Sequence, residues 1–349
     1  MQGQGDSSHA EPKFIPGLEL SELYHNNVVA PILNARLPSL RYSAGLIGTG
    51  SEVLGYDTPQ SMDHNWGLRL FIFLSERDLK ANRRLIEKEL GNKLPLKFLG
   101  YPTSFGEPDE IGVRLPDISR RRKGRVRHYV VLLTIGGFMR EHLGLQDYKR
   151  IKLREWLGLS QQKLLEVTRG RIFRDDLGIK TILQHFRYYP RDIWLYLMAS
   201  QWQKIAEEEA FVARTSAVGD ELGSRIISSR IAQELMELCF LMERRYAPYS
   251  KWFGKAFSEL ETARELKPIL ARVLESESVT ERERCMSKAY QIVAAKHNSL
   301  HITDPISTRV SRYYGRPYMV IHGERFAGEL RRRIESKEIR KLSLTESMK

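Results

Sequence analysis

Cysteine is scarce in this sequence, and long apolar runs are absent. Cys239 and Cys285 are the only cysteines, and they stand far apart, so the sequence predicts neither a cysteine-based zinc site nor a disulfide framework. The longest apolar stretch, 130–138, is too short to span a bilayer. The polar segment 1–13 lacks the apolar core of a signal peptide. We therefore expect two reduced thiols, no membrane association and a cytoplasmic location.

Acidic residues are outnumbered by basic ones. The formal net charge is +13, which favours anionic partners such as nucleotides, nucleic acid or a membrane surface, or simply reflects solvated Lys and Arg. Hydrophobic residues make up 42% and charged residues 28% of the 349 residues, which is typical of a globular chain with enough length for two domains.

Hydrophobic patterning predicts an α+β protein whose helical part follows a small mixed sheet. Short apolar segments bounded by glycine indicate strands at 42–47, 66–74 and 127–134, with helices beside them. From residue 148 onward helical periodicity dominates. The expected organisation is a disordered tail (1–13), a nucleotidyltransferase-like α/β domain (14–147), a mostly helical domain (148–340) and a second disordered tail (341–349).

A glycine-rich segment, Gly48-Thr49-Gly50-Ser51, follows the first expected strand. Without side chains at Gly50, backbone N–H groups and the Ser51 hydroxyl can approach a phosphate closely. A Walker loop is excluded because no lysine follows Gly50, and a dinucleotide fingerprint is excluded because position 53 is valine. The remaining alternatives are a phosphate-binding turn and an ordinary tight turn.

An acidic segment, Asp63-His64-Asn65, precedes the second expected strand. If this segment is extended, the side chains of Asp63 and Asn65 point to the same side and His64 points away. Oxygen ligands in such an arrangement hold Mg²⁺ against a nucleoside triphosphate. We therefore predict Asp63 and Asn65 as metal ligands.

The sequence resembles the domain of unknown function 4037 family of the nucleotidyltransferase superfamily, over about residues 14–334. The segments that carry the resemblance are Gly50-Ser51-Glu52-Val53-Leu54-Gly55-Tyr56-Asp57, Ser61-Met62-Asp63-His64-Asn65-Trp66-Gly67, Tyr189-Pro190-Arg191-Asp192-Ile193-Trp194-Leu195-Tyr196, Glu208-Glu209-Ala210-Phe211, Met242-Glu243-Arg244-Arg245-Tyr246-Ala247-Pro248-Tyr249-Ser250-Lys251-Trp252 and His297-Asn298. The resemblance implies the nucleotidyltransferase fold. The superfamily pattern is Asp-x-Asp, however, and this chain has asparagine at position 65, which removes one charge from the expected Mg²⁺ site.

The resemblance also implies roles for residues outside the two short motifs. Small-molecule adenylyltransferases have a similar two-domain plan, in which a glutamate of the helical domain acts as general base. This implies a catalytic role for Glu208 or Glu209, in addition to the catalytic role expected for Asp63. The alternative for the two glutamates is a solvated acidic helix face. The residues predicted to bind nucleotide are Gly50, Ser51, Arg69, Arg245 and Lys251.

Three functions remain open. The first is Mg²⁺-dependent transfer of a nucleoside monophosphate from a triphosphate, with ATP preferred, to a hydroxyl of an unidentified small-molecule acceptor. The second is nucleotide binding or regulation on the same fold without transfer, which Asn65 favours. The third is RNA binding, which only the positive charge favours, because aromatic residues are not interleaved with the basic run at 120–127.

Overall fold

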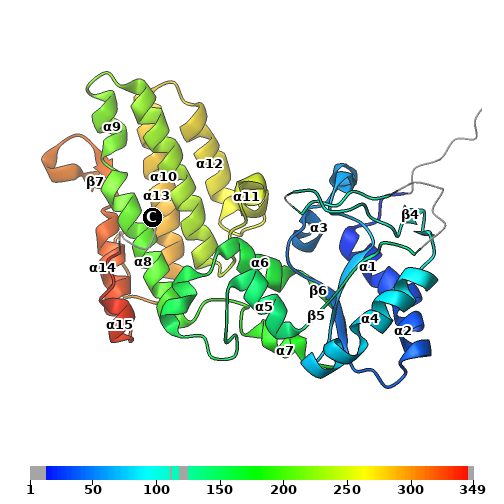
Figure 1. Cartoon of the computed structure of the whole chain (residues 1–349). Coiled ribbons are helices and arrows are strands. Elements are labelled where there is room, and N and C mark those ends of the chain that lie inside the picture. Colours follow the sequence, from blue (N-terminus) through cyan, green and yellow to red (C-terminus); the bar gives the residue numbers. More distant parts are fainter. Residues whose placement is uncertain (1–12, 111, 118–124, 345–349) are drawn as a thin grey trace, which may run out of the picture. The chain divides into compact units, whose positions relative to one another are not determined.

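The computed structural model describes residues 13–110, 112–117 and 125–344. The basic run 120–123, residues 1–12 of the first expected tail and residues 345–349 of the second therefore lie outside the described residues, whereas residues 341–344 are described and Leu344 is buried. The chain divides into two compact units (Figure 1). Unit 1 comprises residues up to Arg150 together with Lys163–Arg187. Unit 2 comprises Ile151–Gln162 and the chain from Tyr188 onward.

Unit 1 contains a four-stranded mixed sheet in the order β5-β2-β1-β6. The strands of this sheet are β1 (Ser43–Leu46), β2 (Arg69–Phe73), β5 (Tyr129–Leu133) and β6 (Arg171–Asp175). Two further strands, β3 (Lys97–Phe98) and β4 (Tyr101–Pro102), form a separate short hairpin. Strand β1 is antiparallel to both β2 and β6, whereas β2 is parallel to β5. The mixed sheet expected from the sequence is therefore present.

The helical segments of unit 1 surround this sheet. They are α1 (Gly17–Tyr24), the π-helical turn His25–Val29, α2 (Ala30–Arg36), α3 (Ser51–Leu54), the 3₁₀ helix Pro59–Asp63, α4 (Glu76–Lys93), α5 (Ile135–Leu143), α6 (Gln161–Arg169, which begins in unit 2) and α7 (Ile179–Gln184). Helix α4 begins at a capped residue, since the Ser75 hydroxyl accepts a hydrogen bond from the backbone N–H of Asp78.

Alternation along β2 explains how both faces of the sheet are covered. Leu70 and Ile72 belong to a core that they share with residues of α1, α2 and α4, which lie together on one side of the sheet (Figure 1). Phe71 and Phe73 point to the other face, where both rings pack against Phe138 of α5. Strand β2 is therefore a central, almost fully buried strand.

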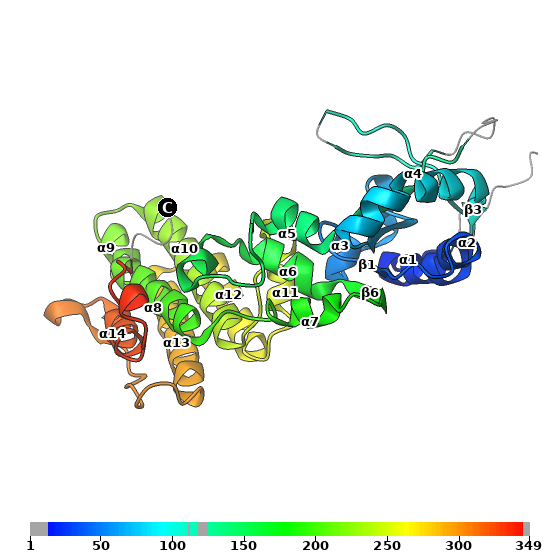
Figure 2. The ribbon, with the colours of Figure 1, turned by 60° about the horizontal axis from the view of Figure 1, so that its bottom comes forward.

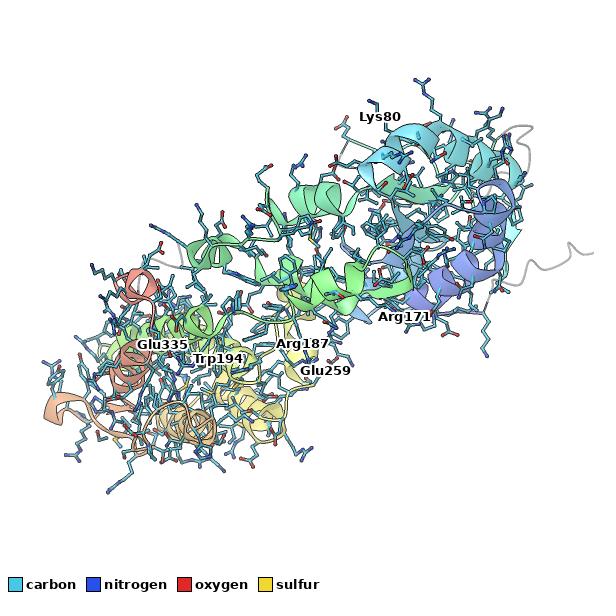
Figure 3. All side chains as sticks on the ribbon, turned by 90° about the horizontal axis from the view of Figure 1, so that it is seen from below. Lys80, Arg171, Arg187, Trp194, Glu259 and Glu335 are labelled. Atoms are coloured by element: carbon cyan, nitrogen blue, oxygen red, sulfur yellow. The ribbon has the colours of Figure 1, made fainter. Side chains whose placement is uncertain are left out.

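Strand β6 is not predicted by the sequence, because helical periodicity dominates after residue 148 and no apolar run marks a strand at 171–175. The strand reads Arg-Ile-Phe-Arg-Asp and lies at an edge of the sheet, so it is only half-buried and carries no long apolar run. Its pairing with β1 brings Lys163–Arg187 back into unit 1. Arg171, labelled in Figure 3, lies on this strand and forms an ion pair with Glu22 of α1.

Unit 2 is a helical bundle with one small hairpin. Its elements are the 3₁₀ helix Leu153–Gly158, α8 (Arg191–Glu208), α9 (Phe211–Ser216), α10 (Glu221–Met242), α11 (Ser250–Phe257), α12 (Ala263–Glu275), α13 (Val279–Ser299), β7 (Ser311–Arg312), the 3₁₀ turn Tyr313–Gly315, β8 (Met319–Val320), α14 (Gly323–Arg332) and α15 (Lys337–Arg340). None of the helices in the described ranges has the length and apolar character needed to cross a bilayer.

Buried aromatic residues join α8, α13 and α14 in the core of unit 2. The rings of Trp202 and Phe326 stack with their centroids 4.2 Å apart. The Trp202 indole N–H donates to Nδ1 of His297 at 3.2 Å, and burial lowers the pKa of His297 to about 4. His297 is thus a buried, hydrogen-bonded histidine. Cys239 and Cys285 are both buried free thiols.

Candidate nucleotide-binding site

The glycine-rich segment forms a turn between β1 and α3, as predicted. Gly48 and Gly50 both have positive φ, at 89° and 143°. A Cβ built at Gly50 would lie 2.2 Å from the Arg69 guanidinium and 2.5 Å from the Glu52 carboxylate, so only glycine fits there. Thr49 is exposed and Ser51 is partly exposed. The turn therefore has a buried underside and a solvent-accessible outer surface.

A buried ion pair supports the underside of this turn. Nε of Arg69 lies 2.6 Å from Oε1 of Glu52, and only 7% and 2% of the two side chains are exposed. The same guanidinium donates a hydrogen bond to the backbone carbonyl of Thr49. Because the guanidinium contacts the buried side of the turn, Arg69 holds the turn in position. Its predicted contact with nucleotide stays a prediction.

A second pair of side chains, which the sequence analysis missed, supports the turn from α5 and α6. The Gly48 N–H donates to the backbone carbonyl of Glu166 at 2.9 Å. Nε2 of His142 lies 3.1 Å from Oε2 of the same residue, and both side chains are largely buried. The His142 ring stacks on Phe138. No sequence motif could reveal this pair, because its two members come together only through the packing of two helices.

The segment at Asp63 differs from the prediction. Asp63 ends a 3₁₀ helix instead of starting a strand, and Asn65 adopts a left-handed backbone with φ of 49°. The physical reason is local: Thr58 and Ser61 form a reciprocal capping box and Pro59 follows the cap, so the chain starts a helical turn there. The predicted extended geometry, with Asp63 and Asn65 side by side on a strand, is therefore wrong.

Asn65 is held by a reciprocal pair of hydrogen bonds to one residue. Its backbone N–H donates to the carbonyl of Arg114 at 2.9 Å, and its side-chain Oδ1 accepts from the backbone N–H of Arg114 at 2.9 Å. Asp63 is exposed, and its Oδ1 lies 2.9 Å from Nδ1 of His64. Within the described ranges, no group of three or more His, Cys, Asp or Glu side chains could hold a metal ion. The predicted side-by-side geometry is therefore missing, and the role of Asp63 and Asn65 as Mg²⁺ ligands stays a prediction.

Glu208 and Glu209, the predicted general bases, both belong to unit 2. Glu208 forms an ion pair with Arg230 of α10, with its Oε1 2.5 Å from Nη2. Glu209 is buried and accepts hydrogen bonds from three backbone N–H groups at the start of α14, those of residues 321–323. Glu209 is therefore an N-terminal cap for α14 supplied by a distant part of the chain. A catalytic role for either glutamate stays a prediction.

Arg245 and Lys251, predicted to bind nucleotide, lie near the two ends of the loop between α10 and α11. Nη2 of Arg245 lies 2.9 Å from Oε2 of Glu259, which Figure 3 labels. Nζ of Lys251 lies 5.0 Å from the centroid of the neighbouring Trp252 ring. These contacts lie within unit 2, and the predicted nucleotide contacts of both residues remain predictions.

Comparison with known proteins gives one family and one structural relative. A search of the curated proteins gave no match. A crystal structure of a nucleotidyltransferase-like protein from Exiguobacterium sibiricum covers 80% of this chain and 76% of its own length, with 12% sequence identity and a TM-score of 0.33. Residues 156–253 match the family model of a domain of unknown function, DUF4037. This segment begins before α6 and reaches into α11, so it includes the motifs around Tyr189 and Arg245 but not those around Gly50 and Asp63. The resemblance inferred from the sequence motifs is thus confirmed over residues 156–253, which match the DUF4037 family model.

Proposed function

We propose that this protein binds a nucleoside triphosphate, with ATP preferred, at the turn 48–51, and that binding does not require Mg²⁺. The turn supports the first part, because it combines a solvent-accessible surface with a buried scaffold that fixes its backbone. The observation that carries the second part is the hydrogen bond from the Arg114 N–H to Oδ1 of Asn65, which occupies the oxygen expected to bind metal.

Transfer of a nucleotidyl group to an acceptor is less well supported than binding. That reaction draws most of its rate from metal ions held by carboxylates near the phosphates. Here Asp63 would be the single carboxylate of its motif, and Asn65 contributes a neutral amide that is already engaged. We therefore favour a nucleotide-binding or regulatory protein over a transferase.

Isothermal titration calorimetry with ATP, GTP, CTP and UTP tests the proposal. We expect ATP to bind equally well with Mg²⁺ and with EDTA. Thr49→Asp should weaken binding at least about tenfold, because it places a negative charge on the exposed part of the turn, where the triphosphate would lie. Gln60→Asp, at an exposed position outside the turn, adds the same charge as a control and should have little effect. Absence of binding to all four nucleotides, or equal losses in both variants, would refute the proposal.

Asn65→Asp tests the role of the missing carboxylate. The fold should tolerate this change, because Asp also accepts the Arg114 N–H and also tolerates a left-handed backbone. Positions 63 and 65 do not share one side of a strand, and the side chain at 65 stays bonded to Arg114, so ATP binding by this variant should remain independent of Mg²⁺. Mg²⁺-dependent tightening of about tenfold or more would instead assign a metal role to this pair. Asn92→Asp, which adds the same charge at an exposed position of α4, should leave the Mg²⁺ dependence unchanged. A parent protein that already needs Mg²⁺ would restore the transferase interpretation.

A further inference from the structure

The β7–β8 hairpin of unit 2 combines basic and aromatic side chains on one short exposed segment. Residues 307–320 include Arg309, Arg312 and Arg316, together with three tyrosines, and contain no aspartate or glutamate. In Figures 1 and 2 the hairpin (orange) projects away from the helices of unit 2. It therefore presents a compact surface of one charge sign that carries aromatic rings.

The three arginines of the hairpin are exposed, and no carboxylate of the described chain forms an ion pair with them. The acidic groups near the base of the hairpin have other partners: Glu283 accepts the Met319 N–H at 2.9 Å, and Glu324 lies 3.5 Å from His322. The positive charge of the hairpin is therefore not neutralised within the protein and is open to an anionic partner.

Tyr314 stands at the tip of the hairpin with its ring in solvent. The residue is 86% exposed, and its ring meets that of Tyr313 edge-on with the centroids 4.7 Å apart. Its backbone is left-handed, with φ of 48°, which is unfavourable for a bulky residue. An aromatic side chain held outward at such a cost is typical of a contact residue.

The base of the hairpin is firmly attached, so the tip is presented by a fixed support. The Ser311 hydroxyl and Nε2 of His322 lie 2.8 Å apart. The Arg325 guanidinium donates to the backbone carbonyls of Ile321, at 2.6 Å, and Ser307, at 3.3 Å. Substitutions at the exposed tip should therefore change recognition without unfolding unit 2.

We propose that this hairpin binds single-stranded nucleic acid. Arginines spaced between tyrosines match a partner that alternates phosphates and bases, because guanidinium groups contact the phosphates while exposed rings stack on unpaired bases. Duplex bases are already stacked on one another, and the arginine–tyrosine tip lacks the Leu, Ile, Phe or Trp side chains that would insert into a membrane. This inference is independent of the nucleotide site proposed for unit 1.

Fluorescence anisotropy with the full chain and labelled 12-nucleotide r(U) and d(T) oligomers tests the proposal. We expect both single strands to bind more tightly than a 12-base-pair duplex, polyglutamate or phosphatidylserine vesicles. Tyr314→Ala should weaken single-strand binding at least about fivefold through lost stacking. Changing Arg309, Arg312 and Arg316 together to Gln should reduce the log–log slope of affinity against salt by about 2.

Phe211→Ala and Arg214→Gln are matched controls, because these two residues form an aromatic–arginine contact on α9 that is not part of the hairpin, and Phe211 is exposed. They should leave oligonucleotide binding unchanged, and the hairpin variants should leave ATP binding unchanged. Failure of the full chain to bind either single strand would overturn the proposal. So would undiminished binding by both hairpin variants, or preferential binding to the duplex, polyglutamate or the vesicles.

Discussion

Arg69→Met is expected to lower the free energy of unfolding of unit 1 by about 3–5 kcal/mol, because it leaves the Glu52 carboxylate buried without its partner. The substitution also removes the hydrogen bond that holds the Thr49 carbonyl, so the turn should lose its fixed shape. Urea titration followed by hydrogen-exchange mass spectrometry of the β1–β2 peptides reports on this unit separately. We expect ATP binding to be lost together with protection of these peptides.

Two further variants separate the ion pair from general effects of charge removal. The double variant Arg69→Met with Glu52→Met should recover much of the lost stability, since no unpaired charge stays buried. Arg83→Met removes an arginine from the half-exposed Arg83–Glu87 pair of α4 and should cost less than about 1 kcal/mol. Equal losses for Arg69→Met and Arg83→Met would show that the buried pair does not stabilise the turn.

Glu209 should make the stability of unit 2 depend on pH between about 4.5 and 7. Burial, partly opposed by the N–H donors of Ile321, Gly323 and His322, raises the pKa of Glu209 from 4.5 to about 7. In this window the folded state binds the proton that the unfolded state has lost, so stability falls as pH rises. The shift corresponds to a loss on the order of 2–3 kcal/mol between pH 4.5 and 8.

Chemical denaturation at a series of pH values, compared with Glu209→Gln, isolates this effect. The neutral amide does not titrate, so the stability of the parent relative to Glu209→Gln should decline from pH 5 to pH 8. Glu208→Gln is the matched control, because Glu208 is adjacent but partly exposed and paired with Arg230. If the difference from Glu209→Gln instead grew with pH, the three N–H donors would dominate over burial and the expected sign would be wrong.

Local sequence was sufficient where neighbouring residues alone fix the conformation. Short apolar segments predict strands β1, β2 and β5, and the glycines at 48 and 50 predict the turn after β1. The half-buried edge strand β6 could not be recognised in this way, because its composition is polar and only its pairing with β1 defines it. The capping box at Thr58 is also a local signal, and it indicates the helical turn 59–63. The interpretation of Asp63 and Asn65 as metal ligands on a strand led to the wrong local structure there.

The sequence by itself determined the mixed sheet, the helical second part, the turn and the resemblance to the DUF4037 family, whose model matches residues 156–253, because these depend on periodicity, glycine placement and long motifs. Only the tertiary structure decided what the polar side chains do. The roles of these side chains depend on partners far away in the chain. Arg69 pairs with Glu52, Glu209 caps α14, and the arginine–tyrosine hairpin is exposed, and none of this can be told from neighbouring residues. The sequence does not show whether a charged side chain is buried in an ion pair or exposed to a ligand. Burial beside a specific partner marks a side chain as structural, whereas exposure leaves it able to bind a ligand.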